Sequence, residues 1–157
     1  MSRMFSATTE AEVTPTISTS AYAAADQLGG LQTLTSVCPD RGDGSVTLAS
    51  VSVVDIDDNG AEIDLFFYTD SPTVASSDNA AANVADGEQL KCRGHVTITA
   101  GSYKAMSANS VGCVKNAGLQ VQGDDNGNVY VLAVIREAAT YSTTSSLTFY
   151  YNFYQDM

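Results

Sequence analysis

The sequence has 157 residues, enough for one domain that buries a hydrophobic core without disulfides or metal ions. Only 16% of the residues are charged, and 18 acidic against 7 basic side chains give a formal net charge of −11. Because nucleic-acid binding depends on Lys and Arg side chains that neutralise phosphates, this balance disfavours nucleic acid as a partner.

Residues 1–16 carry Ser, Thr, Glu and Ala without sustained periodicity, which predicts an extended N-terminal arm. Residues 17–157 then form a single β-sandwich domain. The arm lacks the apolar stretch of a signal peptide, so we expect synthesis in the cytoplasm. No apolar run approaches the ~20 residues of a membrane-spanning helix, and we expect no membrane partner.

From residue 17 the chain is predicted to continue as an extended segment to a Gly-Gly corner at residues 29–30. A strand over 31–37 and a turn-rich loop over 38–45 follow. The loop contains Arg-Gly-Asp at residues 41–43, the integrin-recognition tripeptide. We interpret it as an ordinary turn, because three residues recur often by chance.

Residues 45–68 read SVTLASVSVVDIDDNGAEIDLFFY and predict a central antiparallel hairpin. Ile63, Leu65 and Phe67 alternate with polar or outward residues, which is the period of a half-buried strand. The Asn-Gly pair at residues 59–60 tolerates the positive φ angles of a type I′ turn. We therefore predict that the two arms pair directly as core strands.

The polar segment after residue 68 is too long for a hairpin loop, so we expect it to cross from one sheet to the other. Within it, residues 79–85 predict a short helix. Further along the chain, we expect a strand over 95–100, a loop over 103–110 and a short strand over 111–115.

A second Asp-Asn-Gly corner lies between residues 119–122 and 129–135 and predicts a second hairpin. Apolar residues occupy both faces of 129–135, so this strand is expected to be covered on both sides. In the closing strand, 147–154, four residues face one way: Leu147, Phe149, Tyr151 and Phe153. The whole pattern predicts an all-β fold, an antiparallel β-sandwich or jelly roll with at most one short helix.

Few residues suggest chemistry. Cys92 and the sole histidine, His95, have the spacing of a metal knuckle, but a structural zinc site needs four ligands, and Cys38 and Cys113 are isolated. We interpret the three cysteines as buried free thiols. The sequence contains no phosphate-binding loop, nucleophile elbow or dinucleotide fingerprint. We therefore expect no enzymatic activity and no cofactor.

The central corner offers one metal alternative. Asp55, Asp57, Asn59 and Gly60 match the first half of a calcium-binding loop, but Phe66 stands where the bidentate Glu is needed. We interpret these residues as turn formers and keep weak calcium binding at Asp55, Asp57 and Asn59 as an alternative.

Four segments carry a resemblance to a known family: SAYAAADQLGGLQTL at 20–34, GSVTLASVSVVDIDDNGAEIDLFFYTDSPT at 44–73, SDNAAANVAD at 77–86 and SSLTFYYNFYQD at 145–156. Together they resemble a family of small virion structural proteins of tailed phages and prophages. Its members share an AYA-x-D-x-x-GG opening, a hairpin ending in LFF-x-x-x-P-T, a DNAA segment and a closing LTF strand that ends in QD.

The resemblance implies a non-enzymatic β-sandwich that decorates or cements the outer capsid surface of a virion assembled in the host cytoplasm. The implied partners are the major capsid protein and further copies of the chain, as a homotrimer first and a dimer second. We expect the arm to make these contacts. The contact residues expected in it are Met1, Arg3, Met4, Phe5, Val13 and Pro15.

Two alternatives remain open at this stage. The first is a head fibre, spike or tail adhesin that binds host glycans, which exposed loop aromatics would favour. The second is a hydrolase on a jelly-roll frame, which a cleft holding two close carboxylates with His95 would favour.

Overall fold

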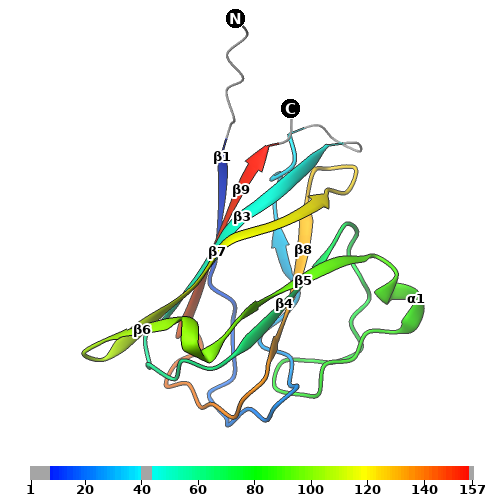
Figure 1. Ribbon diagram of the computed structural model, residues 1–157. Coiled ribbons are helices and arrows are strands. Elements are labelled where there is room, and N and C mark those ends of the chain that lie inside the picture. Colours follow the sequence, from blue (N-terminus) through cyan, green and yellow to red (C-terminus); the bar gives the residue numbers. More distant parts are fainter. Residues whose placement is uncertain (1–7, 40–43, 156–157) are drawn as a thin grey trace, which may run out of the picture.

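The computed structural model describes residues 8–39 and 44–155, and these residues form two antiparallel sheets packed face to face (Figure 1). The five-stranded sheet has the order β1-β9-β3-β7-β6, and the four-stranded sheet has the order β2-β8-β4-β5. The strands are β1 (Thr8–Val13), β2 (Gln32–Leu34), β3 (Ser45–Asp55), β4 (Ile63–Tyr68), β5 (Cys92–Ile98), β6 (Tyr103–Met106), β7 (Asn109–Gln122), β8 (Val129–Ile135) and β9 (Leu147–Gln155). One four-residue α-helix, α1 (Asp86–Gln89), and one 3-10 turn, η1 (Ala100–Ser102), complete the described elements. The predicted all-β sandwich is confirmed.

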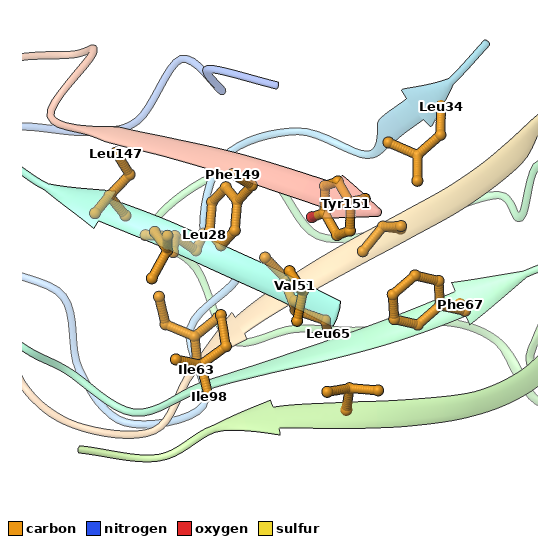
Figure 2. Close-up of a cluster of buried hydrophobic side chains, with 14 of the residues drawn as sticks. Leu28, Leu34, Val51, Ile63, Leu65, Phe67, Ile98, Leu147, Phe149 and Tyr151 are labelled. Carbon is orange, nitrogen blue, oxygen red and sulfur yellow. The ribbon is translucent and has the colours of Figure 1, made fainter. Parts of the chain in front are cut away.

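The core lies between the two sheets and is built by alternating residues. On β9 the four residues predicted to face one way, Leu147, Phe149, Tyr151 and Phe153, are at most 1% exposed. They meet the inward residues of β4, and the rings of Tyr151 and Phe67 stand edge to face with centroids 6.1 Å apart (Figure 2). Burying one such side chain stabilises the fold by about 1.5–3 kcal/mol. This layer of large apolar side chains makes the sandwich rigid.

The predicted central hairpin is wrong. β3 pairs with β7 and β9 in the five-stranded sheet, whereas β4 pairs with β5 and β8 in the four-stranded sheet. Residues 56–62 therefore cross between the sheets, which lie ~10 Å apart in such sandwiches. The positive φ angles fall on Asp58 and Gly60, not on the Asn-Gly pair of a type I′ turn. Both arms are core strands, as predicted, but they face each other across the core.

The second predicted hairpin is wrong for the same reason. β7 belongs to the five-stranded sheet and β8 to the four-stranded sheet, so residues 123–128 also cross between the layers. At Gly127, with φ +78, an added Cβ would approach the Cys38 carbonyl oxygen to 2.6 Å. Glycine is needed there because the loop before β3 packs directly on this corner.

The expected arm over residues 1–16 is wrong for the part that the structure describes. β1 pairs with β9 along its whole length, from Thr8 opposite Tyr154 to Val13 opposite Phe149. Ala11 and Val13 pack against the core, because an alternating strand at the sheet edge has one face to bury. The sandwich therefore includes residue 8 onward, and residues 1–7 lie outside the described residues.

The segment between β4 and β5 does not cross between sheets as predicted, because β4 and β5 are neighbours in the four-stranded sheet. Instead it lies over the outer face of that sheet, where Tyr68, Leu132 and Val134 are buried with Val74 and Val84 packed on them. This cover confirms that β8 is enclosed on both faces.

The remaining differences concern element boundaries. The predicted helix over 79–85 is wrong: Asn79 has φ +59, and the helix forms later, at Asp86–Gln89. β5 begins at Cys92, before the predicted residue 95. The predicted loop over 103–110 is instead part of a hairpin formed by β6 and β7. The short strand predicted over 111–115 belongs to β7, which runs from Asn109 to Gln122.

Candidate docking surfaces

The Asp55 corner is closed by its own backbone. Asp55 is fully buried, and its two carboxylate oxygens accept hydrogen bonds from the N–H groups of Asp57 and Gly60, both at 3.0 Å. Burial raises the pKa of the Asp55 carboxyl above its usual value, while these N–H groups act in the opposite direction. The carboxylate thus caps the turn that carries the chain from one sheet to the other.

The other two residues of the calcium alternative point elsewhere. Asp57 accepts hydrogen bonds from the backbone N–H of Ser142 at 2.9 Å and from its hydroxyl at 2.6 Å. Asn59 donates its side-chain N–H to the carbonyl oxygen of Thr140 at 3.0 Å. The two ranges described contain no group of three or more His, Cys, Asp or Glu side chains placed to hold a metal ion. Asp55 therefore caps the corner from within, while Asp57 and Asn59 connect the corner to the segment that precedes β9.

The second corner is built in the same way around Asp124. Its Oδ1 accepts hydrogen bonds from the N–H groups of Asn126 and Asn128, and its Oδ2 accepts one from the Tyr130 hydroxyl at 2.7 Å. Burial alone would raise the pKa of Asp124, but the hydrogen bonds from Tyr130 and Asn128 outweigh it and lower the pKa. Both Asp-rich corners are structural.

His95 and the cysteines are dispersed. His95 is exposed on β5 and lies against the ring of Phe66, with centroids 5.8 Å apart. None of the cysteines forms a disulfide; Cys38 is buried as predicted, whereas Cys92 and Cys113 are only half-buried.

The expected contact residues of the arm fall into two groups. Val13 is half-buried at the end of β1, and Pro15 is buried, so its side chain is packed within the sandwich and presents no docking surface. Met1, Arg3, Met4 and Phe5 lie outside the described residues, as does the Arg-Gly-Asp tripeptide.

The edge at β1 is the first candidate docking surface. Among the described strands β1 pairs with β9 alone, so β1 forms one edge of the five-stranded sheet, and the backbone N–H and C=O groups on its other side make no bond to another described strand. An edge of this kind accepts an added strand in β-augmentation. Residues 1–7, which precede β1 in the sequence, lie outside the described residues.

The outer face of the five-stranded sheet is the second candidate surface, and we call it the outer face below. No other described segment covers it (Figure 1). The strand registers place its outward residues in four rows: Thr8, Tyr154, Thr47 and Gln120; Glu10, Asn152, Ser50 and Lys115; Glu12, Tyr150, Ser52 and Cys113; Thr148, Val54, Val111 and Lys104. Short hydroxyl, amide and Val side chains dominate at the centre. Most of the long side chains, Glu10, Glu12, Gln120, Lys115 and Lys104, lie on β1, β7 and β6 at its two sides.

Charge is arranged with opposite signs on the two edges of the outer face. Glu10 and Glu12 lie on β1 at one edge, and Lys115 and Lys104 lie on β7 and β6 at the other. All four side chains are exposed. The sequence alone shows these residues but not their separation, since that depends on a strand order no periodicity encodes.

A groove of about 260 Å³ opens between the four-stranded sheet and the segment that covers it. Phe66 and Tyr68 form part of its apolar wall, and Gln89 accepts a hydrogen bond from the Tyr68 hydroxyl at 2.9 Å. Burial raises the pKa of Tyr68 to about 12. At the groove margin Arg136 is ion-paired with Asp64 at 2.6 Å. Sequence reasoning missed this groove, because the cover over β8 was expected to cross between sheets.

Comparison of the sequence with family models gave no match, and comparison with curated proteins gave no significant match. None of the helices in the described ranges has the length and apolar character of a membrane-spanning segment.

Proposed function

We propose that the protein is a non-enzymatic capsid decoration protein that binds the outer surface of a phage head and bridges neighbouring major capsid protein subunits. The observation that supports this proposal best is the β1 edge. The described part of the sandwich starts with an edge strand, and the residues that precede this strand in the sequence include Arg3, Met4 and Phe5.

The physical role of such a module is cementing. Each copy contributes a modest contact through one edge strand and the short segment that precedes it. Many copies bound to a repeating lattice hold adjacent subunits together, because each bridging contact makes the next one effectively intramolecular. The buried aromatic layer keeps the bridge stiff, so strain on the shell reaches the docking contacts without deforming the module.

The structure sharpens the test of this proposal. Removal of residues 1–16 would delete β1 and disturb the sheet, whereas replacing Met4 and Phe5 by serine changes only residues before β1. Purified variants are incubated with heads assembled without the protein, and bound copies are counted by quantitative gel analysis. We expect Met4→Ser/Phe5→Ser to lower occupancy at least about tenfold, as expected for loss of two apolar anchors.

The matched control replaces Leu90 and Met106 by serine. These side chains are 79% and 67% exposed and lie away from β1. The control variant is expected to bind like the unchanged chain. Full occupancy with the Met4→Ser/Phe5→Ser variant would reject docking through the N-terminus.

The groove beside Tyr68 favours the adhesin as a second candidate function. Its aromatic wall, Gln89 and Arg136 combine a stacking surface with polar groups, as glycan sites do. In that case the purified protein would bind host cells directly, and Ala82→Trp, which fills the groove, would abolish the binding. Equal binding by the unchanged chain and the Ala82→Trp variant would exclude the groove as the glycan-binding site.

A further inference from the structure

We infer that a second copy of this chain docks on the outer face, with a twofold axis that runs along β3. The inference concerns the free protein and stands independently of capsid binding. It rests on the charges of the outer face, on its small central side chains and on its size.

Charge identifies this face as the place where two copies approach each other most easily. The chain has a net charge of −11, so two copies repel each other over most orientations. On the outer face, however, the charged side chains of the described strands are two glutamates and two lysines. Elsewhere Lys91 and Arg136 are paired with Glu88 and Asp64. No ion pair engages Lys104 or Lys115 within the described ranges, so both remain available to a partner.

The positions of these charges select one symmetry. A twofold axis along the strands places β1 of each copy over β6 and β7 of the other, so Glu10 and Glu12 lie near Lys115 and Lys104 of the second copy. In this arrangement Glu10 lies about one strand spacing from Lys115 of the second copy, and Glu12 lies about one row from Lys104. These offsets are ~5–7 Å, a distance that a lysine side chain spans. A twofold axis across the strands would instead place β1 over β1 and oppose glutamate to glutamate. Only the first arrangement is electrostatically complementary.

The centre of the face permits close approach. On the proposed axis, residues of β3 lie opposite their own copies, and the outward ones are Thr47, Ser50, Ser52 and Val54. In the same arrangement Tyr150 of each copy faces Cys113 of the other, because their strands flank β3 on opposite sides. One aromatic ring therefore packs over a small side chain on each side of the axis. Such interdigitation is typical of packed sheets.

The size of the face predicts a weak dimer. Five strands at ~4.8 Å spacing and about eight residues at ~3.3 Å each give roughly 500 Å² per copy, or about 1,000 Å² in total. This is near the lower limit for a specific interface, so we expect a dissociation constant in the micromolar range or weaker. Isologous contact through one face gives a closed dimer. The proposed contact therefore predicts a dimer, in place of the homotrimer that the family resemblance implies first.

Charge reversal tests the arrangement. Two variants are made, Glu10→Lys/Glu12→Lys and Lys104→Glu/Lys115→Glu, and sedimentation velocity is recorded over a concentration series up to about millimolar. Each variant alone carries one sign of charge on both edges, and we expect its dimerisation to weaken at least about tenfold. Mixed in equal amounts, the two variants carry opposite signs and are expected to form a heterodimer. Failure of the mixture to associate, or unchanged dimerisation of the single variants, would overturn the inference.

A matched control separates local from overall charge. Asp86→Lys/Asp125→Lys changes the net charge as much as the first variant, but these exposed residues lie outside the outer face. Its dimerisation is expected to be no weaker than that of the unchanged chain. All variants are compared by thermal melting, so that a loss of folding is recognised.

Cross-linking tests the axis itself. In a chain with Cys92 and Cys113 replaced by serine, Ser52→Cys places one thiol of each copy beside the axis. A short bismaleimide is expected to join the two copies. Ser107→Cys, in the turn between β6 and β7, places the thiols at opposite edges and is the control that the reagent should not join. Cross-linking at residue 107 in preference to residue 52 would contradict the proposed symmetry.

Discussion

At the scale of single residues, Asp55 connects sequence, structure and stability. A buried carboxylate is costly unless its oxygens are satisfied, and here two backbone N–H groups satisfy them. We predict that Asp55→Ala lowers the free energy of unfolding by about 2 kcal/mol, since the lost hydrogen bonds outweigh the removed desolvation cost. Urea denaturation measures this change. The control Asp58→Asn removes a neighbouring exposed carboxylate outside this cap and keeps a residue type that tolerates the positive φ at this position, and an equal loss in both variants would contradict the capping role.

Asp124 gives a prediction about pH. Its pKa is lowered in the folded state, so its contribution to stability is present above the unfolded value and is lost as pH falls through the folded value. We expect Asp124→Asn to lose less stability than the unchanged chain between about pH 5 and pH 2, around and below the unfolded carboxyl pKa. Urea midpoints across this interval measure it. Parallel curves for the two proteins would show that Asp124 is not linked to acid unfolding.

Asp55 acts in the opposite direction on the same pH axis. Its pKa is raised, so protonation favours the folded state and its contribution decreases as pH rises through the folded value. The stability of the unchanged chain in acid therefore combines two opposing effects. Protonation of Asp124 destabilises the folded state, and protonation of Asp55 stabilises it. The sequence singled out both Asp-rich corners as turns, but it does not encode which carboxylate is buried.

At the scale of elements, the alternation of apolar residues predicted the inward faces of β4, β8 and β9. It could not predict the partners of β3, because a period of two fixes which face is buried and leaves open which sheet the strand joins. An Asp-Asn-Gly corner is compatible with a hairpin or a crossover, and here both corners are crossovers. The same limit applies to the docking surfaces: the outer face depends on the order of five strands that are distant in sequence.

The N-terminal strand gives a prediction at this scale. Deleting residues 1–7 leaves the β1–β9 pairing intact, and we expect thermal stability to be almost unchanged. Deleting residues 1–13 removes the strand, opens the backbone edge of β9 and takes away the packing of Ala11 and Val13 against the core. The expected loss is several kcal/mol, given the apolar area exposed and the ladder of hydrogen bonds broken. Equal melting temperatures for the two truncations would contradict the placement of β1 in the sheet.

At the scale of the whole molecule, the residues that hold the sandwich together differ from the residues that form the candidate docking surfaces. Large apolar side chains hold the two sheets together, while the β1 edge and the outer face remain available to partners (Figures 1 and 2). In the proposed assembly the edge meets the capsid and the outer face meets a second copy. The two contacts use different surfaces, so variants can separate them.

Copy number in purified virions tests the proposed function most directly. Mass spectrometry with labelled standard peptides gives the ratio of this chain to the major capsid protein. A decoration protein that bridges capsid subunits is predicted to be present in hundreds of copies per particle, in a fixed ratio to the lattice. A dozen copies or fewer, or absence from the particle, would contradict the account.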